Sequence, residues 1–110
     1  MSVPARMSFV TIGARDLTRM REFYKGLGWQ PTLEADNFTA FLLGGVVLGL
    51  YAMENLNAEA APGLAADGGW SGVTLAINVA TREEVDEVWA AAVAAGATPV
   101  VEPVDHPYGP

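Results

Sequence analysis

One short sequence occurs twice in this chain of 110 residues. Residues 8–12 read Ser-Phe-Val-Thr-Ile, and residues 71–75 read Ser-Gly-Val-Thr-Leu, 63 positions later. After a helical stretch the offset grows to 68, and the matched pairs there are Gly28 and Gly96, Pro31 and Pro99, and Glu34 and Glu102. Matched residues at two constant offsets, 63 before the helical stretch and 68 after it, predict a duplicated structural unit whose second copy has a longer helix.

Each copy opens with the pattern of a strand followed by a helix. The opening segments alternate β-branched or other apolar residues with small or polar ones, which is the two-residue period of a strand. Apolar residues then recur every three or four positions, as in an amphipathic helix, after Asp16 in the first copy and Thr81 in the second. Both residue types cap helix N-termini, and Gly28 and Gly96 stand where a left-handed residue ends a helix.

The first copy continues with three further predicted strands, at residues 31–34, 38–43 and 46–51. Gly44 and Gly45 predict a tight hairpin turn of a primed type between the last two strands. The second copy matches only the strand, helix and strand that begin this pattern. We therefore expect an α+β fold of tandem βαβββ modules in one structural domain. Its expected parts are a first module at 1–53, a linker at 54–70, and a second module at 71–110 that lacks its last two strands.

The chain is acidic, with 13 Asp and Glu residues, 6 Lys and Arg residues and a formal net charge of −7. Such a surface repels phosphate groups, so we expect neither nucleic acid nor a membrane as a partner. The absence of cysteine excludes disulfides, thiolate nucleophiles and cysteine-ligated metals. The N-terminal residues lack the apolar core of a signal peptide, and the longest apolar run, 40–53, is too short to cross a bilayer. We therefore expect a cytoplasmic protein.

Two stretches of the first copy resemble a known family. Residues 8–17, SFVTIGARDL, followed by residues 21–29, REFYKGLGW, resemble the opening of the vicinal oxygen chelate superfamily. That superfamily contains glyoxalase I, bleomycin-resistance proteins and extradiol dioxygenases. The spaced residues that carry the resemblance are Asp16, Leu17, Phe23, Tyr24, Leu27 and Gly28. The resemblance implies that two modules form a U-shaped mixed sheet, with helices on its outer face and a cavity on the other.

The resemblance also locates the positions where metal-dependent members of the family bind their ion. Those enzymes place a His on the first strand of each module and a Glu on the last. The first-strand positions here are Phe9 and Gly72, and the last strand of the first module offers Leu48. A phenyl ring, a hydrogen atom and an isobutyl group cannot bind a divalent metal. We therefore expect no metal site and no cofactor.

The cavity face is the remaining candidate for a binding site. Strand alternation predicts that Val10, Ile12, Val73 and Leu75 pack on helices and that the other side chains of these strands face the cavity. The predicted ligand-binding residues are Phe9, Thr11, Leu48, Leu50, Trp70 and Thr74, with Trp70 either capping the pocket or closing the linker. This apolar lining with two hydroxyls suits a flat or aromatic molecule. A filled core without a cavity is the alternative.

Other candidate groups favour a structural role. His106 follows Asp105, but neighbours on an extended segment point to opposite faces, so the pair does not form a ready general base. The acidic run at 83–87 falls in the first turn of a predicted helix, where the helix dipole favours carboxylates. The chain has no nucleophile elbow and no phosphate-binding glycine motif. The sequence therefore predicts no catalytic residues.

Three hypotheses for function follow. The first is metal-independent binding of a small hydrophobic or aromatic molecule by a homodimer, without catalysis. The second is a metal-dependent lyase or dioxygenase of the same superfamily, whose ligands come from further C-terminal residues or a partner chain. The third is an assembly module in which a partner chain covers the open edge of the second copy.

Overall fold

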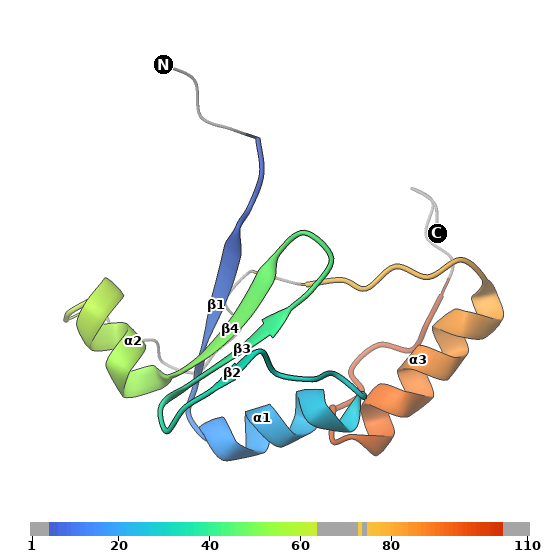
Figure 1. Cartoon of the computed structure of the whole chain (residues 1–110). Coiled ribbons are helices and arrows are strands. Elements are labelled where there is room, and N and C mark those ends of the chain that lie inside the picture. Colours follow the sequence, from blue (N-terminus) through green and yellow to red (C-terminus); the bar gives the residue numbers. More distant parts are fainter. Residues whose placement is uncertain (1–4, 64–72, 74, 105–110) are drawn as a thin grey trace. The chain divides into compact units, whose positions relative to one another are not determined.

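The computed structural model describes residues 5–63, 73 and 75–104, and it divides into two compact units, Met1–Gly69 and Trp70–Pro110 (Figure 1). The first unit contains four strands and two helices in its described residues. They are β1 (Phe9–Ala14), α1 (Leu17–Gly26), β2 (Leu33–Glu34), β3 (Phe38–Leu42), β4 (Val47–Ala52) and α2 (Met53–Ala60). None of the helices in the described ranges combines the length and apolarity needed to cross a bilayer.

The strands form one mixed sheet in the order β1-β4-β3-β2. β1 runs parallel to β4, whereas β3 is antiparallel to both β4 and β2. Because β1 and β4 are parallel, the chain must cross over between them, and α1 lies in that connection. The predicted β-α-β-β-β order of the first copy and the α+β class are thereby confirmed, although β2 is two residues long rather than four.

Helix α1 begins and ends where its sequence predicts. The Asp16 carboxylate accepts a hydrogen bond from the backbone N–H of Arg19 at 3.0 Å, which satisfies one of the N–H groups at the helix start. At the other end Gly28 has φ +92°, a left-handed conformation that residues with a Cβ rarely adopt.

The core of the first unit lies between α1 and one face of the sheet. Its buried centre is Phe41, Leu48 and Leu50. Partly buried side chains pack around this centre, namely Val10, Ile12, Leu17, Met20, Tyr24, Trp29 and Leu43. Each large aliphatic or aromatic side chain in such a core contributes about 1.5–3 kcal/mol to folding.

Leu48 and Leu50 therefore do not lie on the cavity side, and their predicted placement there is wrong. The sheet register pairs Val10 with Leu48 and Ile12 with Leu50, so these side chains project from the same face, toward α1. Residues 46–51 are apolar at nearly every position, and such a run does not reveal which alternate set faces inward. The predicted alternation along residues 46–51 is shifted by one residue from the observed one, and such a shift exchanges the two faces of a strand.

The turn between β3 and β4 also differs from the prediction. Gly45 has φ +90°, but Gly44 is not in the left-handed region, whereas a primed turn requires positive φ at the first central residue. The strands end at Leu42 and start again at Val47, and the backbone N–H of Leu43 donates to the carbonyl of Val46 at 2.8 Å, so Gly44 and Gly45 do form the tip of the turn. Positive φ at the second central residue alone is the pattern of a type II turn rather than a primed one.

Helix α2 lies, except for its first residue Met53, inside the segment 54–70 that was expected to be a linker. It follows β4 directly and contacts β1 and β4 (Figure 1). Gly13 permits this contact, because a Cβ there would come within 2.5 Å of Met53 Sδ and 3.2 Å of Leu56 Cδ2. Gly13 shares a face with Phe9 and Thr11, so α2 covers one end of the sheet face opposite α1.

The described residues of the second unit form one helix, α3 (Arg82–Ala94). As predicted, the Thr81 hydroxyl caps it by accepting from the backbone N–H of Glu84 at 3.1 Å, and Gly96 has φ +118°. No strand is assigned to residues 73, 75–79 or 97–104. Val73 and Leu75, which we expected to pack on helices, are 65% and 57% exposed. A strand is defined by hydrogen bonds to a neighbouring strand, and alternation in sequence alone does not determine that pairing.

Candidate functional site

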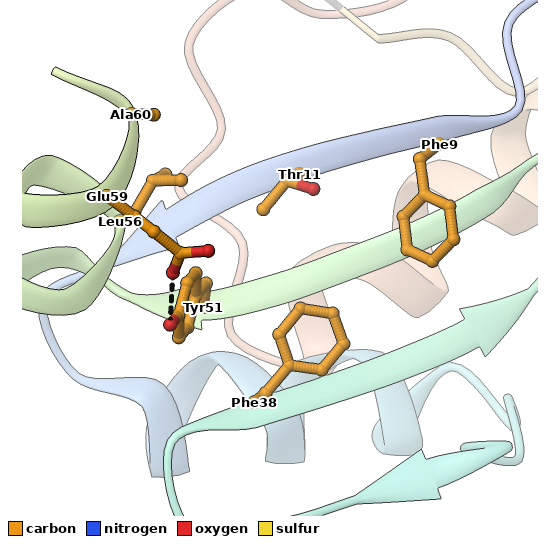
Figure 2. Close-up of a pocket in the computed structure, with 7 residues that line it drawn as sticks. All are labelled: Phe9, Thr11, Phe38, Tyr51, Leu56, Glu59 and Ala60. Atoms are coloured by element: carbon orange, nitrogen blue, oxygen red, sulfur yellow. Dashed lines mark hydrogen bonds between the residues drawn. The ribbon is translucent and has the colours of Figure 1, made fainter.

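The sheet face opposite α1, here called the open face, carries a pocket of about 250 Å³ (Figure 2). Three strands and α2 contribute to it. Its lining residues are Phe9, Thr11, Phe38, Tyr51, Leu56, Glu59 and Ala60. The site is therefore built within the first unit, with strand side chains as its floor and α2 as its end wall.

The strand residues reach the pocket through the sheet register. Thr11 is paired with Gly49 in β4, and Tyr51 is paired with Phe38 in β3, so these positions share the open face. The rings of Phe38 and Tyr51 meet edge to face, with centroids 5.5 Å apart and an interplanar angle of 73°. Such aromatic pairs stabilise by about 0.5–1.5 kcal/mol beyond the area they bury.

Gly49 allows Phe38 to lie close against β4. A Cβ at this position would come within 2.9 Å of Phe38 Cζ and 3.4 Å of Thr11 Oγ1. The Phe38 ring thus lies over a strand position that has no side chain, beside the Thr11 hydroxyl. A glycine inside a strand is a known sign of close approach by another group.

The polar end of the pocket is a hydrogen-bonded pair from β4 and α2. The Tyr51 hydroxyl donates to Glu59 Oε2 at 2.5 Å (Figure 2). This hydrogen bond raises the pKa of Tyr51 above its ordinary value of 10.0, and burial and the negative charge of Glu59 act in the same direction. Tyr51 therefore keeps its proton, and donates it to Glu59, throughout the neutral range.

Two of the six predicted ligand-binding residues line this pocket, Phe9 and Thr11. Leu48 and Leu50 belong to the core instead, and Trp70 and Thr74 lie outside the described residues. The sequence reasoning missed Phe38 and Tyr51 on the strands and Leu56, Glu59 and Ala60 on α2. The interior glycine of β4 was the available signal for the strand residues, whereas the α2 residues depended on a helix that was not predicted.

The open face does not fit the family's metal site. With Leu48 in the core, the β4 residues that face the pocket side are Val47, Gly49 and Tyr51, beside Phe9 on β1. None carries a carboxylate or an imidazole, which are the usual protein ligands of divalent metals. Within the described ranges, no three His, Cys, Asp or Glu side chains are grouped so as to hold an ion.

Comparison with solved structures gives close matches over nearly the whole chain. A glyoxalase-related enzyme from Fulvimarina pelagi is 27% identical, with a TM-score of 0.86 over 96% of this chain and 76% of its own. A glyoxalase/bleomycin resistance protein/dioxygenase family enzyme from Burkholderia phytofirmans PsJN is 31% identical, with a TM-score of 0.73 over 96% and 84%. Lactoylglutathione lyase from Agrobacterium tumefaciens, 22% identical with a TM-score of 0.69 over 97% and 81%, shares the fold.

Comparison with curated proteins gives no match. The family model that describes the Glyoxalase/Bleomycin resistance protein/Dioxygenase superfamily matches residues 6–110, almost the full length of the chain. This match agrees with the resemblance carried by the opening strand and helix, and with the mixed sheet of the first unit. The chain therefore belongs to the glyoxalase/bleomycin resistance protein/dioxygenase superfamily.

Proposed function

We propose that this protein binds a small hydrophobic or aromatic molecule in the open-face pocket, and that it does so without a metal ion. The observation that carries the proposal is the lining of the pocket. Aromatic side chains from β1, β3 and β4 surround the Thr11 hydroxyl on a sheet face whose strand positions lack metal ligands. Binding pockets typically combine such apolar walls with a few polar groups that orient the ligand.

The exposure of Phe9 supports a ligand at this place. Phe9 is 54% exposed although it lies on a strand beside other apolar residues. Covering such surface is favourable by about 25 cal/mol for each Å² of apolar area, and a flat ring can make an additional aromatic contact. An aromatic ligand therefore gains affinity from the part of the pocket that water now contacts.

The size of the pocket limits the ligand. Pockets for drug-sized molecules enclose about 300–1,000 Å³, and this one, at about 250 Å³, lies just below that range. We therefore propose a ligand with one or two rings rather than a large, flexible molecule.

A thermal-shift screen tests the proposal. EDTA-treated protein is heated with single-ring and two-ring aromatic compounds, because a ligand that binds only the folded state raises the melting temperature. At a ligand concentration of about 100 Kd the stabilisation is about 2.7 kcal/mol, which corresponds to several degrees for a small domain.

Matched variants locate the effect. Phe9→Ala should abolish most of the ligand-induced shift. Leu33→Ala removes an equally exposed apolar strand residue, 54% in both cases, outside the pocket and should leave the shift unchanged. The proposal fails if no compound raises the melting temperature. It also fails if stabilisation requires added Ni²⁺, Zn²⁺, Fe²⁺ or Mn²⁺.

A further inference from the structure

One side chain gives the pocket a formal charge. Of the seven residues that line it, Glu59 is the charged one, and it projects from α2 at the end of the pocket (Figure 2). The ion pairs within the described residues join side chains of α1 to Glu34 of β2 or to each other, and none includes Glu59. The Glu59 carboxylate therefore borders an apolar pocket and takes part in none of these three ion pairs.

The Tyr51 hydroxyl does not neutralise this charge. Its hydrogen bond to Glu59 instead leaves only acceptor atoms at this end of the pocket. Its single proton is donated to Glu59 Oε2. The Tyr51 oxygen is then left with lone pairs, and an ionised carboxylate can only accept. Both groups consequently offer acceptors to a ligand, and neither offers a donor.

A ligand that fills the pocket also removes water from this carboxylate. Displacing that water is unfavourable unless the ligand replaces the lost hydrogen bonds, and for a charged group the requirement is strongest. A ligand with an acceptor or a negative charge at this end meets only repulsion. A positively charged N–H donor satisfies both the hydrogen bond and the charge.

We propose that the pocket selects aromatic molecules that carry a cationic N–H group, such as a primary ammonium or an amidinium, which donates to Glu59. This inference rests on the proposed function, since it requires that aromatic molecules enter the pocket. It adds the chemical class of the ligand and names Glu59 as the residue that determines specificity.

The test uses three probes that share one ring system: naphthylmethylamine, which is cationic, naphthylmethanol, which is neutral, and naphthoate, which is anionic. Isothermal titration calorimetry on the full chain at neutral pH compares their affinities. We expect the amine to bind at least about tenfold more tightly than the alcohol, the effect of one charge-assisted hydrogen bond. We expect the anion to bind most weakly.

Two substitutions on the same helix separate the local contact from the overall acidity of the protein. Glu59→Gln keeps the size of the side chain and an acceptor for Tyr51, and should bring the affinities for amine and alcohol together. Glu54→Gln makes the same change of charge on α2 at a residue that does not line the pocket, and should keep the preference. Since both substitutions change surface-exposed side chains, both proteins should fold.

The outcomes distinguish the two proposals. If none of the three probes binds, the proposed function and this inference both fail. If the alcohol binds as tightly as the amine, aromatic binding stands and the selectivity is wrong. The selectivity through Glu59 is also wrong if Glu59→Gln retains the preference for the amine, or if Glu54→Gln reduces it equally.

Discussion

Two glycines on the open face bring neighbouring elements close to the sheet. Gly49 lies beneath the Phe38 ring, and Gly13 lies beneath the Met53 and Leu56 side chains of α2. The two contacts differ in how easily they can adjust, because Met53 is flexible and a phenyl ring is rigid. The shape of the pocket therefore depends more on Gly49 than on Gly13.

We expect Gly49→Ala to destabilise the protein by about 1–3 kcal/mol, since the new Cβ overlaps the Phe38 ring and overpacking costs about this much. Gly44→Ala is the control, because a Cβ added at Gly44 would meet no other group within 4 Å and its φ is not left-handed. Urea denaturation measures both. Equal stabilities for the two variants would show that Phe38 does not lie against Gly49.

The Tyr51–Glu59 hydrogen bond predicts how the stability of the folded protein changes at alkaline pH. The pKa of Tyr51 is raised in the folded protein, chiefly by this bond, and the pKa of Tyr24 is raised by burial. A group with a raised folded pKa contributes stability that is present below its unfolded pKa, near 10, and lost as pH rises through the folded value. Stability should therefore decline only at pH above about 10 on account of these tyrosines.

Ultraviolet titration of tyrosinate checks this prediction. The difference between wild type and Tyr51→Phe isolates the Tyr51 signal, which should appear above the ordinary value of 10.0. In a Glu59→Gln background, the same difference should move back toward that value, because the charge-assisted hydrogen bond to the carboxylate is replaced by a weaker one to a neutral amide and the negative charge is gone. A Tyr51 pKa that is unaffected by Glu59→Gln would contradict the hydrogen bond.

At the scale of elements, one arginine ties α1 to the sheet. Arg21 donates from Nε to the hydroxyl of Thr39 and from Nη2 to the carbonyl of Ala35, at 2.7 Å in both cases, and pairs with Glu34 at 3.3 Å. Thr39 is fully buried, so its hydroxyl depends on a partner from within the protein. This polar contact fixes how α1 lies on the sheet in addition to the apolar core.

Arg21→Met keeps the apolar stem but removes these donors. We expect the free energy of unfolding to fall by about 1–3 kcal/mol, because the buried Thr39 hydroxyl loses its hydrogen-bond donor. Adding Thr39→Val should recover part of that loss, since two apolar partners leave no unsatisfied group. Lys25→Met breaks only exposed ion pairs and should cost less than about 1 kcal/mol. Chemical denaturation compares the wild type, Arg21→Met, the double variant with Thr39→Val, and Lys25→Met. A double variant no more stable than Arg21→Met would contradict this role of Thr39.

The elements that the sequence predicted well are those with local chemical signals. Asp16 and Gly28 mark the ends of α1 by capping and by left-handed φ, and both act within a few residues. The phase of β4 has no such signal, because its position relative to β1 is set by pairing between distant residues. Helix α2 carries no side-chain cap at its start, and its stability depends on packing over Gly13. For these reasons Leu48 and Leu50 were misplaced, and Glu59 was not found.

At the scale of the whole molecule, the duplication in sequence is only partly a duplication in structure. The first copy forms a complete βαβββ sheet, whereas α3 is the one element assigned among the described residues of the second. The exposed side chains of Leu75 and Ile77, 57% and 58%, belong to the predicted strand of this second copy. Local alternation predicted a strand there, but it is pairing that determines whether a strand forms.

The homodimer expected from the sequence stays a prediction. Among the described residues, the outer strands of the sheet, β1 and β2, each have a neighbouring strand on one side, and proteins commonly cover the other edge of such strands. Sedimentation equilibrium at micromolar concentration should give the mass of two chains rather than the 11.6 kDa of one. A mass of one chain at every concentration would contradict the dimer.

The most direct test of metal-free binding at the open face is an NMR titration of the ¹⁵N-labelled protein with naphthylmethylamine in EDTA. We expect the largest amide shifts around the pocket, at Thr11, Gly49, Tyr51 and Glu59, while the α1 face of the sheet changes little. Metal-free binding at this place would confirm the open-face pocket as the functional site. Largest shifts on α1, or shifts that appear only after a divalent metal is added, would contradict it.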